Sequence, residues 1–394
     1  MNAAPSSNLH FTSTTASDGN GERTFTPNDN SDGAPLLLMG HGIGLHEHTP
    51  RLASGARQPV AGDGPGDGPT TAAINTPGLG DRPRSDQDEP WVDATRRAPA
   101  AGERALVLGG GGSTGNAWLI GVSAGLFDAG LDVTAAALTI GPSAGSTAAA
   151  QIAGATPTGL LAAILAAGPQ QRTGPVGSDP GRVSIRPVAD HMERTGRIIA
   201  SAEDAADMRR RMGAAALDMD AASDGSWQTQ WRATVASRLP SQRWPQRTVL
   251  ITAVNAHTGD PVVFDRYSGV DLADAVAASC ASGLPYRIGD NRYIDGGYRT
   301  NAENADLAAG YGRVLVLSPF GGRTLTPADW GMHLATQVDE LRAGGSRVET
   351  IFPDSSSEHM FGPHAMDLSL RPPAARAGYD QGRALAEHLT EFWR

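Results

Sequence analysis

The stretch that decides the fold is Ala137-Leu138-Thr139-Ile140-Gly141-Pro142-Ser143-Ala144-Gly145-Ser146. Its first four residues have the apolar character of a buried strand, and the alanine-rich sequence after Ser146 favours a helix. Gly141 and Gly145 flank Ser143 and allow the strand and the helix to approach each other closely across a tight turn. Such a turn presents the serine hydroxyl at the edge of a sheet, so Ser143 is the candidate nucleophile.

Two other segments also match the pattern Gly-x-Ser-x-Gly, which is easily met by chance in a chain with 49 glycines. Residues 111–115 lie in a glycine-rich loop. Residues 121–125 fall inside a pattern of apolar residues with helical spacing, and a serine in the middle of a helix cannot occupy a strained turn. Only Ser143 has an apolar strand before it and a helix after it.

Composition divides the chain into a tail and one domain. Residues 1–100 are rich in Gly, Pro, Ser, Thr, Asn and Asp, and their 7 Arg against 12 Asp and Glu give half of the chain's net charge of -10. This composition predicts a disordered tail at 1–100 and one folded domain at 101–394. Three histidines in the tail (His41, His46 and His48) have the residue type of metal ligands, but an acidic disordered segment favours no specific metal site.

Charge and hydropathy exclude several classes of protein. A net charge of -10 and a pI near 5.4 disfavour nucleic acid as a partner and provide no basic patch for an anionic lipid surface. Neither a signal peptide nor a stretch of 18 apolar residues is present, which predicts a soluble, cytoplasmic protein. Cys280 is the single cysteine, so the chain has no internal disulfide, and we expect a small buried side chain there.

Strand and helix patterns alternate along the predicted domain, which favours an α/β fold with its site at the carboxyl ends of the strands. Residues 169–245 are predicted to form a mainly helical excursion beside the sheet. It begins with a Gly/Pro-rich loop at 169–182 and has helical periodicity from 187 to 216 and again from 227 to 239. The predicted strands are 104–108, the run before Ser143, 248–254, 261–264, 285–288, 292–297, 313–317 and 347–352; predicted helices include 116–129, 144–153, 157–165, 227–239, 271–282 and 373–393.

A glycine-rich loop follows the first predicted strand. Its backbone N–H groups, at the positive end of a helix and free of side chains, suit an oxyanion that develops in a transition state. The same loop satisfies Gly-x-Gly-x-x-Gly from Gly110 to Gly115, the fingerprint of dinucleotide binding. That alternative requires an acidic residue at the end of the second strand, where this chain has Gly141-Pro142-Ser143 instead.

A serine nucleophile needs a base, and Asp295 has the most distinctive setting among the candidates. It follows the β-like pair Tyr293-Ile294 and precedes Gly296 and Gly297, which permit a sharp turn. No histidine after Ser143 has a comparable setting. The alternative is that Asp295 only caps its own turn, as Asp-Gly pairs often do.

These segments, in this order, resemble the patatin-like phospholipases, a family of lipid acyl hydrolases. The loop Gly110–Gly115 resembles the family's oxyanion loop, Gly141–Gly145 its nucleophile elbow, and Asp295-Gly296-Gly297 with Asn301 its acidic motif. Segments 259–264 and 278–285 resemble the parts that precede that motif. The resemblance covers residues 104–318 and implies a three-layer α/β/α domain with a mixed, mainly parallel sheet.

The resemblance also implies a mechanism. Ser143 attacks the ester carbonyl and Asp295 takes its proton, without a histidine, while the N–H groups of Gly110, Gly111 and Gly112 hold the oxyanion. The supporting glycines of the three motifs are Gly115, Gly141, Gly145, Gly296 and Gly297. No metal and no cofactor is implied. Six side chains of the helical excursion are candidates for an acyl-chain entrance, with ordinary core packing as the alternative: Met192, Met208, Met212, Met219, Trp227 and Trp231.

Two departures from the family pattern affect the expected substrate. Ser113 and Thr114 stand where the family commonly has Arg or Lys, and Pro142 replaces the usual small residue before the serine. The expectation is a hydrolase of lipase or phospholipase A type that acts on a lipid ester and contacts membranes transiently. Two alternatives remain: an acyltransferase that uses the same acyl-enzyme, and a non-catalytic regulator that binds a lipid or a nucleotide.

Overall fold

One mixed sheet forms the middle layer of the fold, which is known from a computed structural model. The structure describes residues 103–167, 186–223 and 225–394. The predicted tail at 1–100, with His41, His46 and His48, and the loop predicted at 169–182 lie outside the described residues. Among the described residues the sheet has eight strands: β1 (Arg104–Leu108), β2 (Leu138–Gly141), β3 (Thr248–Asn255), β4 (Pro261–Phe264), β5 (Tyr286–Ile288), β6 (Asn291–Asp295), β7 (Arg313–Leu317) and β8 (Arg347–Ile351).

The strand order is β5-β6-β3-β2-β1-β7-β8, and β4 pairs with β3 off this path. Four pairings are parallel and join β3, β2, β1, β7 and β8. Three pairings are antiparallel, those of β3 with β4, β3 with β6 and β5 with β6. The predicted α/β fold with a mixed, mainly parallel sheet is confirmed.

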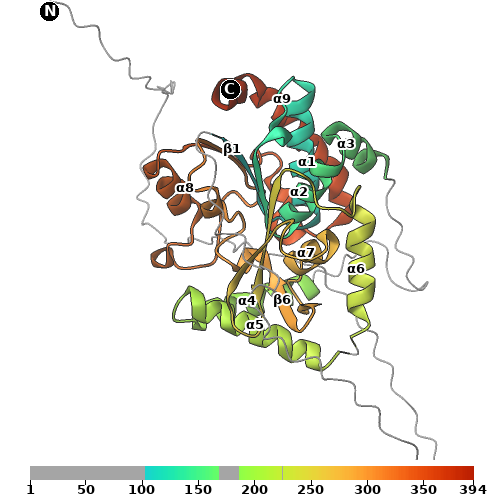
Figure 1. Ribbon diagram of the computed structural model, residues 1–394, viewed down its shortest axis with the longest axis vertical. Helices are drawn as coiled ribbons and strands as arrows, with labels where there is room; N and C mark the ends of the chain where they lie inside the picture. Colours follow the sequence, from blue (N-terminus) through green and yellow to red (C-terminus); the bar gives the residue numbers. More distant parts are fainter. Residues whose placement is uncertain (1–102, 168–185, 224) are drawn as a thin grey trace, which may run out of the picture. The chain divides into compact units, whose positions relative to one another are not determined.

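Helices cover both faces of the sheet (Figure 1). The α-helices of the described residues are α1 (Gly112–Asp128), α2 (Ala144–Gly154), α3 (Pro157–Ala166), α4 (Arg186–Ser201), α5 (Ala205–Ala221), α6 (Trp227–Arg238), α7 (Leu272–Ser279), α8 (Leu334–Ala343) and α9 (Arg371–Trp393). Short 3-10 helices are η2 (Val133–Ala135), η3 (Gly296–Tyr298), η4 (Ala305–Ala308), η5 (Ala328–Trp330), η6 (Glu358–Met360), η7 (Gly362–His364) and η8 (Leu368–Leu370).

The two faces of the sheet have separate cores because side chains alternate along each strand. Leu106 and Leu108 of β1 pack in the cluster that contains α1, α2, α7 and α9. Ala105 and Val107 pack on the opposite face, in the cluster that contains α8 and η4. Beside β3 and β6, α4 and α5 cover the α8 side of the sheet. The result is three layers, helix on sheet on helix.

Helices α1 and α9 pack with their backbones in close contact through glycines. A Cβ atom on Gly121 or Gly125 of α1 would overlap a backbone carbonyl oxygen of α9, and the reverse holds for Gly378 and Gly382 of α9. The second Gly-x-Ser-x-Gly segment therefore serves helix packing. Its Ser123 is buried, and the hydroxyl donates to the Leu119 carbonyl at 2.8 Å.

The start of α1 differs from the prediction. The helix begins at Gly112 rather than 116, so the end of the glycine-rich loop is already helical. Two helices, α4 and α5, occupy the region with helical periodicity from 187 to 216. Asp204 caps α5 by accepting a hydrogen bond from the Asp207 N–H at 2.7 Å, which stabilises a new helix start at the break.

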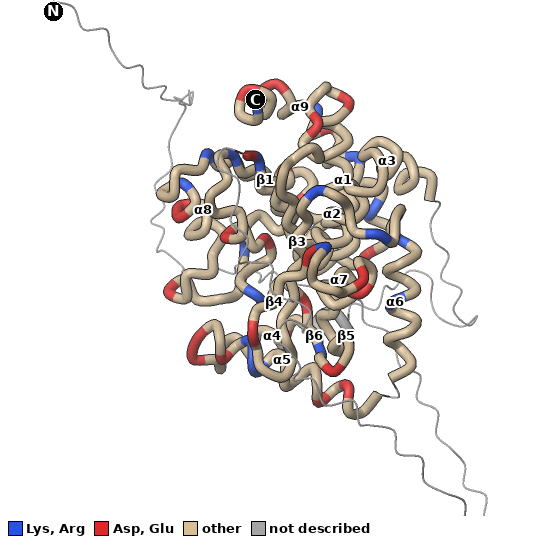
Figure 2. Tube along the Cα trace, viewed as in Figure 1, with Lys and Arg blue, Asp and Glu red and all other residues tan. Residues whose placement is uncertain are grey.

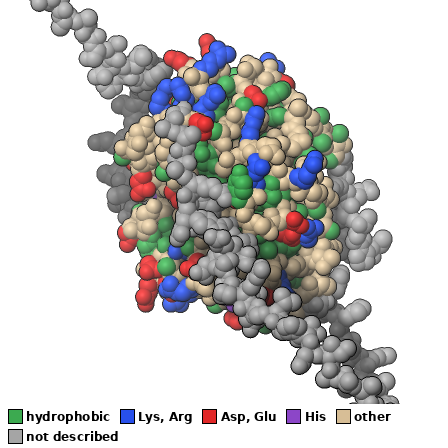
Figure 3. All heavy atoms as spheres, in the orientation of Figure 1, with side chains coloured by type: hydrophobic (Ala, Val, Ile, Leu, Met, Phe, Trp, Pro, Cys, Tyr) green, Lys and Arg blue, Asp and Glu red, His purple; other side chains and the backbone are tan. Residues whose placement is uncertain are grey.

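Charged residues lie mainly on the outer helices and loops, whereas β2, β3 and β4 contain none (Figure 2). On the face drawn in Figure 3, acidic and basic side chains are interspersed with apolar ones. Within the described ranges no single helix is long and apolar enough to cross a membrane. Helices α2 and α3 reach that threshold only as a pair, and the pair is bent by 117°.

Candidate active site

Ser143 lies at the turn between β2 and α2 in a conformation that L-amino acids rarely adopt. Its φ is 51° and its ψ is -120°, and Asn304 is the only other non-glycine residue with positive φ in the described part of the chain. Strain of this kind costs roughly 1–3 kcal/mol and persists only where the surroundings enforce it. The side chain makes no capping hydrogen bond to α2, although Ser143 is the N-cap residue. The hydroxyl is therefore not committed to holding the helix.

Glycine is required on both sides of Ser143 by close backbone contacts. A Cβ atom on Gly145 would overlap the carbonyl oxygen of Leu108, and one on Gly141 would overlap the backbone of Gly145. The first contact presses α2 onto the end of β1, and the second closes the turn. Both glycines do what the sequence analysis expected of them.

Asp295 ends β6 and is fully buried. The strand pairs with β3, which places Asp295 opposite Ala253. Oδ1 accepts a hydrogen bond from the Gly297 N–H at 2.9 Å, so Asp295 does cap its own turn. A Cβ atom on Gly296 would overlap the Thr252 carbonyl, so the turn requires glycine there. The cap uses one carboxylate oxygen only, and Oδ2 is free of that task.

The pKa of Asp295 depends on its burial and on the nearby Ser143. Burial raises the pKa of Asp295 to about 7, and the Gly297 N–H and the nearby Ser143 hydroxyl oppose this rise only in part. Within the described residues no hydrogen bond of regular geometry reaches Oδ2. The fold thus brings together two residues that are 152 positions apart, 295 - 143, and gives the carboxyl group a pKa suited to proton transfer near neutral pH.

The glycine-rich loop follows β1, but its N–H groups are not equivalent. Gly110 donates its N–H to the Ala302 carbonyl at 2.6 Å, so this group is already engaged. The N–H groups of Gly111 and Gly112 make none of the loop's backbone hydrogen bonds. Of the three glycines expected to hold an oxyanion, Gly111 and Gly112 therefore keep N–H groups outside these backbone hydrogen bonds. Gly115 donates back to the Gly111 carbonyl at 2.9 Å and closes the first turn of α1.

A cation reaches the loop from a distant part of the chain. Arg371, the first residue of α9, donates to the Ser113 carbonyl at 2.8 Å and to the Ser113 hydroxyl at 3.1 Å, and its Nη2 donates to Asn116 Oδ1 at 3.3 Å. Burial lowers the pKa of Arg371 to about 10, which leaves it charged at neutral pH. Ser113 and Thr114 leave the loop itself without a cation, and no local pattern in the sequence points to Arg371.

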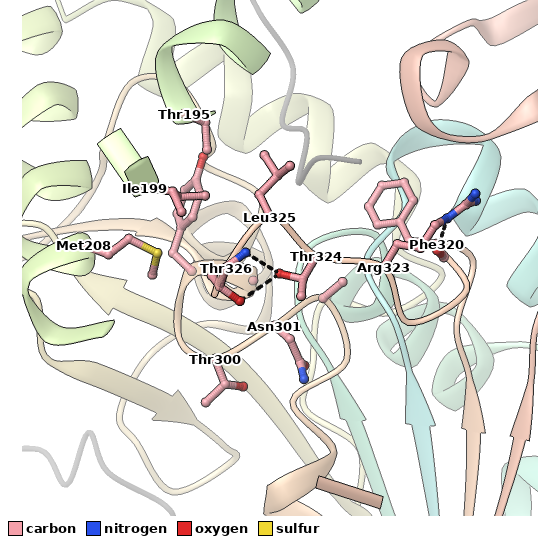
Figure 4. Close-up of a pocket in the computed structure, with 13 residues that line it drawn as sticks. Thr195, Ile199, Met208, Thr300, Asn301, Phe320, Arg323, Thr324, Leu325 and Thr326 are labelled. Atoms are coloured by element: carbon pink, nitrogen blue, oxygen red, sulfur yellow. Dashed lines mark hydrogen bonds between the residues drawn. The ribbon is translucent and has the colours of Figure 1, made fainter. Parts of the chain in front are cut away.

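Two cavities among the described residues lie near Ser143 and Asp295, but neither cavity is lined by these two residues. The larger, about 440 Å³ with its space open to solvent, adjoins the turn at Gly297 and the Ala302 whose carbonyl holds the loop. Figure 4 shows it between α4, α5 and the segment that follows β7. Its other lining residues are Thr195, Ile199, Met208, Tyr298, Thr300, Asn301, Phe320, Arg323, Thr324, Leu325 and Thr326.

The candidate entrance residues separate into four groups. Met208 lines the larger cavity, while Met212 and Met219 line a second cavity of about 280 Å³. Met192 packs against the buried cluster of Ala302, Phe320 and Ala365. Trp227 and Trp231 belong to the main core and line neither cavity, as the alternative of ordinary core packing predicts. In the described ranges no three His, Cys, Asp or Glu side chains are arranged to hold a metal ion.

Fold and site together define the class: this is an α/β protein whose mixed sheet presents a strained serine next to a buried aspartate. No protein-family model matches the sequence, and neither does any curated protein sequence. Among solved structures, VipD from Legionella pneumophila is similar over 74% of this chain and 67% of its own, with 14% identity and a TM-score of 0.34.

The type III effector protein ExoU is similar over 74% of this chain, with 15% identity and a TM-score of 0.31. This chain spans 54% of the ExoU chain, about half its length. Similarity this remote carries no information about what the present protein does.

Proposed function

We propose that this protein is a serine acyl hydrolase that cleaves carboxylic esters of lipids through Ser143 and Asp295. The observation that carries the proposal is the strained, uncommitted Ser143 next to an aspartate whose buried carboxyl has a pKa of about 7. The order of the loop, the elbow and the Asp-Gly-Gly turn supports a lipid ester as substrate, since it resembles the patatin-like phospholipases.

In the proposed reaction, Asp295 accepts the Ser143 hydroxyl proton as Oγ attacks the ester carbonyl. The resulting oxyanion accepts hydrogen bonds from the N–H groups of Gly111 and Gly112 at the start of α1. Collapse of this intermediate returns the proton to the leaving alcohol and leaves an acyl-serine. Asp295 then takes a proton from water, whose oxygen attacks the acyl group, and the carboxylic acid is released as Ser143 regains its proton.

A fluorophosphonate probe tests this proposal directly. We expect the wild-type protein to be labelled at Ser143 and to hydrolyse p-nitrophenyl esters, and Ser143→Ala to lose both properties. Acyl transfer to an added alcohol, measured by product analysis, separates hydrolase from acyltransferase. An unlabelled, inactive wild-type protein would overturn the hydrolase proposal and favour a regulator that uses the glycine-rich loop for binding. Labelling that persists in Ser143→Ala would show that another serine is the nucleophile.

The larger cavity is the proposed site for the acyl chain. Ile199, Met208 and Leu325 supply apolar surface, and the cavity adjoins Gly297, two residues beyond the proposed base. We expect Met208→Phe to reduce kcat/KM for long-chain esters by about 10-fold, because the larger ring fills space, and to leave acetate esters nearly unaffected.

Met212→Phe is the matched control, since Met212 is equally buried but lines only the second cavity. Kinetics with p-nitrophenyl esters of increasing chain length distinguish the two variants. A loss of long-chain activity in Met212→Phe alone would instead place the acyl chain in the second cavity.

A further inference from the structure

A short segment at the end of α7 contacts the backbone of both Ser143 and Asp295. It consists of Ser279, Cys280 and Ala281. We call these residues the 279–281 bracket. The Ser143 N–H donates to the Ser279 hydroxyl at 2.9 Å, and the Cys280 thiol donates to the Ser143 carbonyl at 3.1 Å. The Asp295 N–H donates to the Ala281 carbonyl at 2.9 Å. One short segment is thus hydrogen-bonded to the nucleophile and to the base.

The bracket supports Ser143 in its unfavourable backbone conformation. Ser279 is completely buried, so its hydroxyl has no water to compete with the Ser143 N–H. The Ser143 carbonyl also accepts from the Ser146 hydroxyl at 2.6 Å, and that hydroxyl lies 3.6 Å from the Cys280 sulfur. Both the N–H and the carbonyl of the strained residue Ser143 therefore have side-chain partners. Without them, the turn would lose the contacts that offset its unfavourable φ.

The bracket also relates the two reactive side chains to each other. Ser143 belongs to the turn after β2, and Asp295 belongs to the end of β6, so no local sequence sets their separation. Burial, and secondly the negative charge of Asp295, raise the pKa of the Cys280 thiol to about 11, so the thiol is a neutral donor at neutral pH. Proton transfer between serine and aspartate requires hydrogen-bond distance, and a misplacement of 1 Å costs about 10²-fold in rate.

We propose that the 279–281 bracket sets the distance and orientation between Ser143 and Asp295, and that Ser279 and Cys280 are positioning residues. The catalytic consequence rests on the proposed function; the structural claim does not. Two independent measurements follow from this distinction.

The first measurement is hydrogen exchange of the Ser143 amide. Ser279→Ala removes its only side-chain acceptor, so we expect exchange in the segment 138–146 to accelerate by about 10-fold or more relative to wild type. Ser346→Ala is the matched control. Ser346 is also a buried serine, and its hydroxyl donates to the Tyr311 carbonyl at 2.6 Å, just before the first residue of β7. Unchanged exchange in Ser279→Ala would overturn the bracket, whether or not the protein is an enzyme.

The second measurement is kinetic and uses substitutions at Cys280. Cys280→Ala removes one of the side-chain donors to the Ser143 carbonyl and leaves the Ser146 hydroxyl in place, whereas Cys280→Ser restores a donor at position 280. We expect Cys280→Ala and Ser279→Ala to lower kcat and the rate of fluorophosphonate labelling by roughly 10- to 100-fold with KM within about 2-fold, and Cys280→Ser to recover most of the loss.

Equal rates in Cys280→Ala, Cys280→Ser and wild type, with accelerated exchange in Ser279→Ala, would overturn the positioning role. A wild-type protein without labelling would overturn the hydrolase proposal, and the exchange experiment would still decide the bracket. Should Ser279→Ala fail to fold, the Cys280 pair provides both the exchange and the kinetic comparison.

Discussion

Asp295→Asn is expected to inactivate the protein and to make it more stable above neutral pH. The asparagine oxygen can still accept the Gly297 hydrogen bond, so the turn is retained, but the amide cannot take the Ser143 proton. We expect kcat/KM to fall by roughly 10²–10⁴-fold. In the wild-type protein kcat/KM should rise about tenfold per pH unit below a pKa of about 7 and level off above it.

The stability effect follows from the same pKa. The folded-state pKa of Asp295 is raised from 3.8 to about 7, so the folded protein holds this proton more tightly than the unfolded chain does. In the wild-type protein, the contribution of Asp295 to the free energy of unfolding is largest below pH 3.8 and is lost as the pH rises through about 7. Asn cannot ionise, so the variant should gain roughly 2–4 kcal/mol of unfolding free energy over wild type at pH 8, and the gain should shrink as the pH falls.

Urea unfolding at several pH values measures this difference. Ser143→Ala is the control, because it is also inactive but keeps the carboxyl group, so its stability should follow the wild-type pH dependence. A variant Asp295→Asn that is no more stable than wild type at pH 8 would contradict the buried, high-pKa carboxyl. Full activity in the variant would exclude Asp295 as the base.

Among glycine-to-alanine substitutions near the site, Gly145→Ala is expected to destabilise the fold most. The added Cβ would overlap the carbonyl oxygen of Leu108, and it also approaches the Gly109 carbonyl to 3.0 Å, so α2 must move away from the end of β1. Overpacking against backbone cannot be relieved by a side-chain rotation, and we expect a loss of about 3 kcal/mol. Activity should fall with it, because α2 begins directly after Ser143.

Gly196→Ala in α4 is the matched control, because a Cβ atom there meets no heavy atom within 4 Å. Since alanine is the better helix former, this variant should match or exceed wild-type stability by up to about 1 kcal/mol. Chemical unfolding, followed by circular dichroism, compares the two variants. Equal stability of Gly145→Ala and Gly196→Ala would show that the close approach of α2 to β1 is not required.

Much of the secondary structure follows from local sequence. The strands at 261–264 and 313–317 are confirmed at both ends, because turn residues bound short apolar runs there. The break between α4 and α5 was not predictable in the same way. Apolar periodicity continues through the break, and only the Asp204 side chain, bonded to the Asp207 N–H, marks the start of a new helix.

By itself the sequence determined the α/β class and the two positions, Ser143 and Asp295, at which glycine-bounded strand ends present polar side chains. These signals are local, since each depends on a few neighbouring residues that limit backbone conformation. Tertiary structure alone decided that the Ala302 carbonyl accepts a hydrogen bond from the Gly110 N–H and that Arg371 reaches Ser113. It also decided that the 279–281 bracket is hydrogen-bonded to both Ser143 and Asp295. Those contacts join residues far apart in the chain, and no periodicity or motif encodes which distant donor meets which acceptor; the packing of the sheet and its helices does.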